Sequence, residues 1–285
     1  MRIALLADIH GNLHALQAVM GQIRTGKVDR MAVLGDLSFG LPFVNETVSL
    51  IRSVPHTMAV RGNGEDRLLR LASQERAGWV DGQMRAAYWT VRNLSLETYG
   101  YLASLPETTC VKEGFMPVYA AHTLFRMTGV EEPLDGEVTP ALPDDLREGV
   151  LVFGHTHRSW QARRGKTILV NPGSVGLPMD GMPEASYAIL DERGGTWQVE
   201  QYRVSYDVES LIAAVRTSSL YDADPVWAAL AIRELRTARN HVYPFLAWCG
   251  KYARQIGDSR RPFAPDTWEA AYRAWNFDVS FPAVR

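Results

Sequence analysis

The stretch Ile3–His10, IALLADIH, decides how the rest of the chain is interpreted. Its first five residues are apolar without a break, which is typical of a strand that is buried on both faces of a sheet. Asp8 and His10 follow at once, so two metal-binding side-chain types stand where this strand is expected to end. In an extended backbone the i, i+2 spacing would put both side chains on the same side.

Four more apolar runs end in the same way. We expect buried strands at 31–34, 57–60, 117–121 and 150–153. The polar residues that follow these runs are Asp36, Asn63, His122, His155 and His157. In open α/β sheets the carboxyl ends of the strands form the edge at which ligands collect. The sequence therefore predicts one site, built from the residues that follow the five strands.

The residue types at this edge suit a pair of divalent metal ions. Carboxylate, amide oxygen and imidazole are hard to borderline donors, which favour Mn, Fe, Zn or similar ions. The two cysteines, Cys110 and Cys249, lie far apart and have no spacing for a thiolate site. Glycines at 11, 35, 62 and 154 would let the chain turn beside the ions without a Cβ in the way.

Composition limits the possible partners. The chain has 285 residues, of which 46% are hydrophobic, so it can bury a sizeable core. Thirty basic and 32 acidic residues leave a formal charge of −2, which gives no long-range field for nucleic acid or a membrane. The apolar start lacks a cleavage pattern, and no run approaches the roughly 18 apolar residues of a membrane span. We expect a cytoplasmic protein, and the sequence leaves a homo-oligomer open.

The order of elements predicts the fold class. Strand and helix patterns alternate in the first half, with Asn12 capping the first helix, a second helix at 42–52, and a helical region at 65–103 interrupted near Gly78 and Gly82. Short strands are expected at 108–111, 118–121, 151–153, 161–164, 167–170, 185–190 and 196–204. This pattern predicts a mostly parallel sheet that faces a mostly antiparallel one.

Helical patterns dominate the end of the chain. We therefore expect a domain at 1–204 and a helical extension at 205–285 that packs on it. The extension could cap the site, form a dimer contact or complete the core. The loop Thr123–Arg147, rich in Glu, Asp and Pro, is the candidate for an ordered excursion or a lid. His56 and His241 have no supporting motif and are interpreted as structural.

Taken in order, the motifs resemble those of a known family. They are Asp8-x-His10, Gly35-Asp36, Gly62-Asn63, His122 and Gly154-His155-x-His157. Together they are similar to the calcineurin-like metallophosphoesterases, particularly the compact bacterial and archaeal branch related to YfcE. The continuation Asn171-Pro172-Gly173-Ser174 is also similar to that branch. The resemblance spans about residues 1–216 and implies a four-layer α/β/β/α sandwich with a dinuclear metal site between the sheet ends.

The resemblance also implies a role for each ligand. The family pattern places Asp8, His10 and His157 on one ion, and Asn63, His122 and His155 on the other. Asp36 would bridge both, and Asp36, Asn63 and His122 would be catalytic. The implied activity is hydrolysis of a small-molecule phosphoester, most simply by a phosphodiesterase in which a hydroxide bridges the two ions.

Alternatives to this activity remain open. A phosphomonoesterase, a protein phosphatase and a dinucleoside polyphosphate hydrolase are close variants of the same chemistry. A nuclease is disfavoured by the near-neutral charge. A non-catalytic binding scaffold is disfavoured by the complete ligand set.

Two residues are candidates for substrate binding. Arg61 is expected to contact phosphate, because an arginine at this motif position does so in related Ser/Thr phosphatases; a surface ion pair is the alternative. His14, near the start of the first helix, could face the cleft, or it could cap the helix or be solvated. Glu65 and Asp66 are expected to begin the next helix and to orient ligands.

The sequence departs from the family pattern at one position. Many members have a histidine after the asparagine that serves as general acid, and here that position is Gly64. Glycine donates no proton from a side chain, so we expect a preference for leaving groups that need little protonation, such as those of aryl diesters or phosphoanhydrides.

Overall fold

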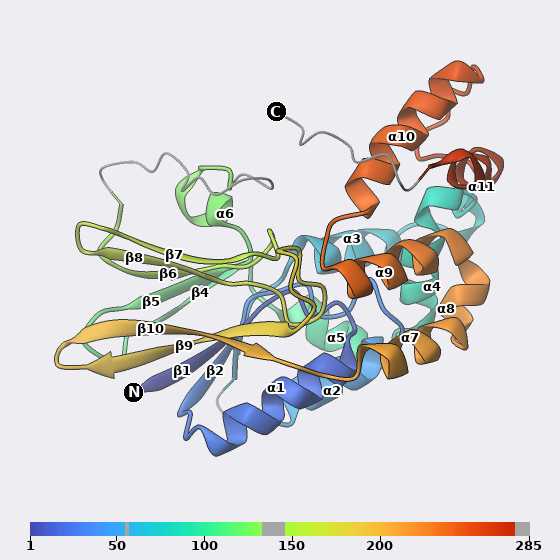
Figure 1. The fold of residues 1–285 in the computed structure, drawn as a ribbon. Coiled ribbons are helices and arrows are strands. Elements are labelled where there is room, and N and C mark those ends of the chain that lie inside the picture. Colours follow the sequence, from blue (N-terminus) through green and yellow to red (C-terminus); the bar gives the residue numbers. More distant parts are fainter. Residues whose placement is uncertain (55–56, 133–145, 277–285) are drawn as a thin grey trace.

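The computed structural model describes residues 1–54, 57–132 and 146–276. Two five-stranded sheets face each other, and helices lie on their outer sides (Figure 1). This is the four-layer α/β/β/α sandwich that the family resemblance implies, followed by further helices. His56 and residues 133–145 of the expected lid lie outside the described part of the chain.

The first sheet has the order β10-β9-β1-β2-β3. Its strands are β1 (Arg2–Leu6), β2 (Arg30–Val33), β3 (Thr57–Ala59), β9 (Ala185–Arg193) and β10 (Thr196–Val204). β1, β2 and β3 are parallel, whereas β9 pairs antiparallel with both β1 and β10. Ile3 of β1 lies opposite Leu190 of β9, so strands from the two ends of residues 2–204 meet in one sheet.

The second sheet has the order β4-β5-β6-β8-β7. Its strands are β4 (Thr108–Val111), β5 (Val118–Ala121), β6 (Gly149–Val152), β7 (Ser159–Arg164) and β8 (Thr167–Pro172). The central pairs are parallel and the two edge pairs are antiparallel. Each sheet therefore has two parallel and two antiparallel pairs, and the expectation of a mostly parallel sheet facing a mostly antiparallel one is wrong. The apolar pattern of a segment indicates that it forms a buried strand, but it does not indicate which distant strand pairs with it.

The two faces of β1 explain why its sequence is apolar throughout. Ile3 and Leu5 point into the layer between the sheets, where they pack with residues such as Val150. Ala4 and Leu6 point to the opposite face and belong to the core beneath the helices. A strand that is covered on both sides has no polar face to keep.

The helices that precede β6 begin near the predicted positions, except for a short one within the expected loop 123–147. They are α1 (Leu13–Thr25), α2 (Val44–Arg52), α3 (Asn63–Ala72), α4 (Arg85–Asn93), α5 (Leu96–Ser104) and α6 (Leu124–Thr128). Asn12 caps α1 as expected, because its Oδ1 accepts a hydrogen bond from the Ala15 amide at 2.9 Å. Short 3₁₀ turns, η1 (Arg76–Gly78) and η2 (Gly82–Met84), interrupt the helical region between α3 and α4.

Five helices follow the last strand and pack at one end of the sandwich (Figure 1). They are α7 (Val208–Arg216), α8 (Ser219–Ala223), α9 (Pro225–Thr237), α10 (Val242–Gln255) and α11 (Pro265–Ala274). Leu211 and Ala228 share a core with Leu41 and Leu177, which lie in the loops after β2 and β8. The extension therefore packs on loops at the carboxyl ends of the strands. Among the described residues, none of the helices combines the length and apolar character needed to cross a membrane.

Candidate metal centre

The residues predicted to bind metal converge at one edge of the two sheets. Asp8 and His10 follow β1, Asp36 follows β2, Asn63 begins α3, His122 follows β5, and His155 and His157 follow β6. Ligand atoms of Asp8, His10 and His157 lie within 4.8 Å of one another, and so do those of Asp8, Asp36 and His122. These residues come from four strand ends, which is the arrangement that the sequence predicts.

Asp36 lies between two groups of imidazoles. Its Oδ2 is 3.8 Å from His10 Nε2 on one side and 3.6 Å from His122 Nε2 on the other. His122 Nε2 also lies 2.8 Å from Asn63 Oδ1. The ring of His155 is 5.3 Å from that of His122, centroid to centroid, so it belongs to the same side of Asp36 as Asn63.

Backbone carbonyls fix three of the imidazoles. His122 Nδ1 donates to Leu34 O at 2.7 Å, and His157 Nδ1 donates to Leu177 O at 2.6 Å. His10 Nδ1 donates to Phe39 O. Because a carbonyl oxygen can only accept, each Nδ1 carries the hydrogen and each Nε2 keeps its lone pair. All three lone pairs therefore point into the centre.

This arrangement fits a bound cation. His10 Nε2 and His157 Nε2 face each other across 3.0 Å, although neither carries a hydrogen in the neutral ring. Burial lowers the pKa of both imidazoles, and that of His157 falls well below its ordinary value because His10 adds to the effect. Two buried acceptors that face each other need a positive charge between them, and neutral imidazole Nε2 is a common metal donor.

The two buried aspartates fit a cation as well. Burial and the charge of Asp36 raise the pKa of Asp8 well above its usual range. Burial also acts to raise the pKa of Asp36, but the imidazoles of His122 and His10 outweigh it and bring the pKa to about 2. Two carboxylates in a buried site are costly unless positive charge compensates them.

Five of the predicted metal ligands have an unusual backbone conformation. The φ angles of Asp8, His10, Asp36, His155 and His157 are 53°, 53°, 52°, 77° and 59°, all in the left-handed region. Non-glycine residues adopt this region rarely, and such residues cluster at functional sites. The side chains of Asp8 and His10 therefore converge through turns. The expectation of an extended backbone through Asp8 and His10 is wrong, because both residues have left-handed φ angles.

Glu65 joins the loop after β2 to the start of α3. Its carboxylate accepts hydrogen bonds from the amides of Asp36 at 2.8 Å, Leu37 at 2.8 Å and Gly62 at 2.9 Å. Burial and the nearby Asp36 raise the pKa of Glu65 to about 7. Glu65 thus orients a ligand as expected, whereas Asp66 instead forms ion pairs with Arg61 and Arg126.

Close contacts explain the glycines that precede ligands. A Cβ at Gly62 would lie 2.1 Å from Asp36 Oδ1, and a Cβ at Gly154 would lie 2.6 Å from Asp8 Oδ2. At Gly64 the distance to Asp36 Oδ1 would be 2.9 Å, and the Gly64 amide donates to this oxygen at 2.7 Å. The glycines leave room for the carboxylates.

The Asn-Pro-Gly-Ser segment supports the histidine loop. Asn171 Nδ2 donates to Gly154 O at 2.8 Å, and Ser174 Oγ donates to Asp8 O at 2.7 Å. Buried Glu132 accepts from Asn171 Nδ2 and from Thr156 Oγ1, each at 3.1 Å. No local pattern indicates a role for Glu132, because its partners Thr156 and Asn171 lie 24 and 39 positions further along the chain.

The two residues expected to bind substrate have other partners. Arg61 pairs with Asp66, and its Nη2 lies 3.1 Å from Glu107 Oε1. The ring of His14 lies 5.6 Å from the ring of Phe43, centroid to centroid. Among the described residues, neither side chain forms a hydrogen bond or an ion pair with a predicted ligand. The contacts of Arg61 favour the ion-pair alternative, and substrate binding by either residue stays a prediction.

The helical extension touches the support of His10. Trp227 of α9 donates its indole N–H to Gly40 O at 2.8 Å, and its ring lies 5.0 Å from that of Phe39. Phe39 is the residue whose carbonyl accepts from His10. Nothing in the local sequence relates Trp227 to a loop that lies 187 positions earlier.

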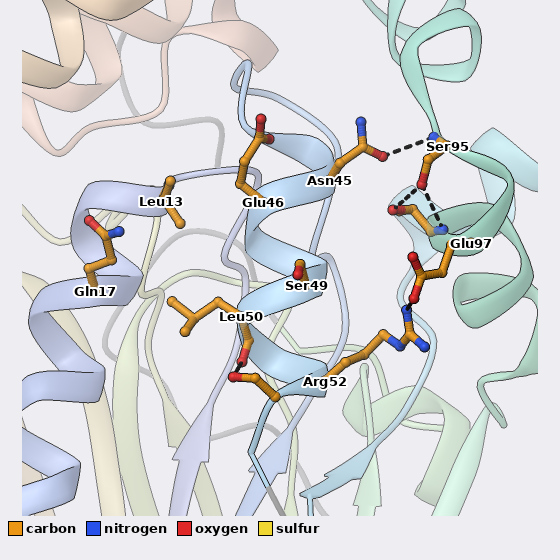
Figure 2. Close-up of a pocket in the computed structure, with 11 residues that line it drawn as sticks. Leu13, Gln17, Asn45, Glu46, Ser49, Leu50, Arg52, Ser95 and Glu97 are labelled. Carbon is orange, nitrogen blue, oxygen red and sulfur yellow. Dashed lines mark hydrogen bonds and ion pairs between the residues drawn. The ribbon is translucent and has the colours of Figure 1, made fainter.

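A separate depression of about 590 Å³ lies among α1, α2 and α5 (Figure 2). The ion pair between Arg52 and Glu97 crosses one side of it, and the Ser95 amide donates to Asn45 Oδ1 at 2.9 Å. None of the residues that line it is a predicted metal ligand. We therefore assign it no part in the metal centre.

Comparison with known proteins identifies the class. Residues 1–195 match the calcineurin-like phosphoesterase superfamily domain. An uncharacterized protein of Methanocaldococcus jannaschii is 31% identical over 228 residues, which are 73% of this chain and 88% of that protein. The chain therefore belongs to the calcineurin-like phosphoesterase superfamily and is a hydrolase.

Two further relatives are phosphoesterases. The crystal structure of a metallophosphoesterase from Sphaerobacter thermophilus superposes with a TM-score of 0.65 at 28% identity, covering 84% of this chain and 99% of that one. Phosphodiesterase YfcE of Escherichia coli K12 is 48% identical over 50 residues, which are 18% of this chain and 27% of YfcE. Within the superfamily, this 50-residue stretch of the chain is similar to YfcE.

Proposed function

We propose that the protein is a phosphodiesterase with a dinuclear metal centre. Asp8, His10 and His157 would hold one ion, Asn63, His122 and His155 would hold the other, and Asp36 would contact both. The observation that carries this proposal is the pair of Nε2 lone pairs that face each other across 3.0 Å beside Asp36. When bound, Mn, Fe, Zn or similar ions would supply the charge that activates water and neutralises phosphoryl oxygens.

The protein's own groups hold this centre in one geometry. The Asp36 carboxylate accepts from the Gly64 amide at Oδ1, so Oδ2 remains free to face His10 and His122. The carbonyls that accept from each Nδ1 keep the imidazoles in the tautomer that offers Nε2. A substrate phosphoryl group would therefore meet preoriented ligands, which lowers the cost of assembling the site during the reaction.

Position 64 bears on the choice of leaving group. The only donor that Gly64 offers is its amide, which is already bonded to Asp36. No side chain at this position can protonate a departing alkoxide. We therefore propose substrates whose leaving group is stable as an anion, such as aryl diesters or phosphoanhydrides. We propose a small-molecule phosphoester as the substrate, because the charge of −2 does not favour nucleic acid. We propose that the protein acts in the cytoplasm.

The proposal is tested by metal content and activity together. Elemental analysis of active protein should find two divalent ions per chain. Activity would be measured on bis-nitrophenyl phosphate, nitrophenyl phosphate, a dinucleoside polyphosphate and single-stranded DNA, with Mn²⁺ and with chelator. Asp36→Asn should lower kcat/KM on the diester by roughly 100-fold or more, because it removes the charge between the ions. Asp222→Asn, an exposed carboxylate on α8, is the matched control. Chelator-resistant activity, or full activity of Asp36→Asn, would contradict the proposal.

A further inference from the structure

Helix α9 of the extension contacts two loops, and each loop fixes one of the two imidazoles that face each other. The loop after β2 contains Phe39, whose carbonyl accepts from His10 Nδ1. The loop after β8 contains Leu177, whose carbonyl accepts from His157 Nδ1 at 2.6 Å. The separation of the two imidazoles therefore depends on how these loops are held relative to each other.

The first loop is held by the start of α9. Trp227 donates its indole N–H to Gly40 O at 2.8 Å, and its ring lies 5.0 Å from that of Phe39. The Trp227 amide donates to buried Asp224 Oδ1 at 3.0 Å, which fixes this turn of the helix. Gly40 directly follows Phe39, so the indole holds the peptide group next to the carbonyl that fixes His10.

The second loop is held by the end of α9. Ala238, the C-cap residue, accepts a hydrogen bond from the Gly181 amide at 2.9 Å. In the same loop the Met179 amide donates to His157 O at 3.1 Å. This loop therefore supports both the ring and the backbone of His157, and α9 holds the loop in place.

Between its two ends, one face of α9 packs on both loops. Leu235 of α9 shares a core with Leu41 of the first loop and Leu177 of the second. Leu230 lies on a different face of α9 and belongs to the core that α9 forms with α10 and α11. A helix of 13 residues is about 20 Å long, so one continuous element extends from loop to loop.

The other half of the metal centre has a different support. His122 Nδ1 donates to Leu34 O at 2.7 Å. Leu34 belongs to the core between the two sheets, and among the residues that the structure describes this core contains none from the helical extension. The orientation of His122 therefore does not depend on the face of α9 that carries Leu235.

We propose that α9 is a positioning element for one of the two metal ions. By holding both loops it sets the separation of His10 Nε2 and His157 Nε2, which is 3.0 Å, and with it the affinity for the ion shared with Asp8. The inference rests on the proposed function and assigns the helical extension a role in it. Leu235 is a positioning residue, because it acts through the loops.

The test compares two leucines of α9. Leu235→Ala and Leu230→Ala remove the same atoms from sites that are 2% and 0% exposed, so both should lower the free energy of unfolding to a similar extent. Leu235 is a sharper choice than Trp227, because Trp227 also packs in the core that contains Leu68 of α3, the helix that begins at Asn63.

Calorimetric titration of the metal-free protein with Mn²⁺ should resolve two binding events in the wild type. In Leu235→Ala one event should weaken by roughly tenfold and the other should stay unchanged, as expected for loss of a group that orients ligands. Leu230→Ala should keep both events. Equal weakening of both ions in Leu235→Ala, or equal effects of the two variants, would overturn the inference and leave the proposed function standing.

NMR spectroscopy of the metal-free protein tests the same inference without an ion. The Nδ1–H groups of His10, His157 and His122 would be followed by their exchange with water. Leu235→Ala should raise the exchange rates at His10 and His157 relative to His122 by about tenfold, because the two loops open locally. Leu230→Ala should leave this ratio unchanged, since a general loss of stability affects all three groups alike. An unchanged ratio in Leu235→Ala would overturn the inference.

These measurements separate failure of the inference from failure of the proposed function. If the wild type binds fewer than two Mn²⁺ ions, the proposed dinuclear centre fails, and the exchange ratio still decides whether α9 positions His10 and His157. If the alanine variants do not fold, Leu235→Val and Leu230→Val repeat both comparisons with a smaller change in volume.

Discussion

The metal centre and the helical extension are encoded in different ways. The seven proposed ligands follow five strands within a few residues, so local sequence carries their positions. Trp227 supports the same centre from 187 residues beyond Gly40, and only the fold brings the two together. Local motifs therefore predict the proposed metal ligands, whereas the groups that orient these ligands come from long-range packing.

The largest expected effect comes from a change within one of the local motifs, Gly62-Asn63. Gly62→Ala places a Cβ 2.1 Å from Asp36 Oδ1, so the carboxylate or the start of α3 must move. We expect loss of bound metal and a fall in kcat/KM of roughly 100-fold or more. Elemental analysis and kinetics on bis-nitrophenyl phosphate measure both.

The control for this variant is Gly21→Ala. Gly21 lies within α1, and a Cβ there would meet no atom within 4 Å. Because alanine favours a helix over glycine, this variant should gain up to about 1 kcal/mol of stability and keep its metal. Normal metal content in Gly62→Ala would show that the centre tolerates displacement of Asp36.

A moderate effect is expected when the long-range contact between Trp227 and Gly40 is removed. Trp227→Phe keeps a ring beside Phe39 but removes the hydrogen bond to Gly40 O. We expect divalent metal to bind roughly tenfold more weakly, as for other losses of groups that orient ligands. Titration of the metal-free protein with Mn²⁺ measures the change.

Trp248→Phe provides a matched comparison within the extension. It removes an indole hydrogen bond of 2.9 Å to Ala271 O, between α10 and α11. Like Trp227→Phe, it should lower the free energy of unfolding by about 1 kcal/mol, because one hydrogen bond is lost. Unlike Trp227→Phe, it should leave metal affinity unchanged. If both tryptophan variants weaken metal binding equally, the extension acts on the centre only through general stability.

The smallest effect is a pH dependence of metal-free protein. Burial, with His122 and Arg126 nearby, lowers the pKa of His155 from 6.5 to about 4. Between these values the unfolded chain binds a proton that the folded chain does not, so His155 makes stability fall as pH decreases from 6.5 to 4. His155→Asn should lose this contribution. Denaturant unfolding at several pH values, wild type against variant, measures the difference.

His241 in the extension sharpens the same measurement. Burial and two arginines, Arg233 and Arg239, lower its pKa to about 4, so it contributes in the same pH window. Bound metal should suppress the contribution of His155, since a proposed ligand cannot be protonated while it holds an ion. It should leave that of His241 unchanged. Suppression of both contributions, or of neither, would contradict the assignment of His155.

The strands and the candidate ligands could be predicted because the information is local. Continuous apolar runs such as Ile3–Ala7 mark buried strands, and the polar residues after them mark the functional edge. Sheet pairing could not be predicted in the same way. The hairpin of β9 and β10 joins the first sheet beside β1, and this pairing depends on competition among distant strands.

The site could be predicted in its donors but not in its supports. The carbonyls of Leu34, Phe39 and Leu177 fix the imidazoles, yet a backbone carbonyl is present at every residue and leaves no mark in the sequence. Arg61 shows a second limit. Its position beside Asn63 favoured a role in substrate binding, but its guanidinium pairs with Asp66 and Glu107. Side-chain partners follow from three-dimensional neighbours.

The left-handed φ angles of five proposed ligands bear on how such a centre could be transplanted. A designer who copied only the side chains onto ordinary strand ends would obtain the right donors on the wrong trajectories. The transferable unit is each donor together with its turn. Asparagine is the replacement most compatible with those turns, since it tolerates this conformation better than alanine does. Asparagine variants therefore remove a charge or a ring while sparing the architecture that aims it.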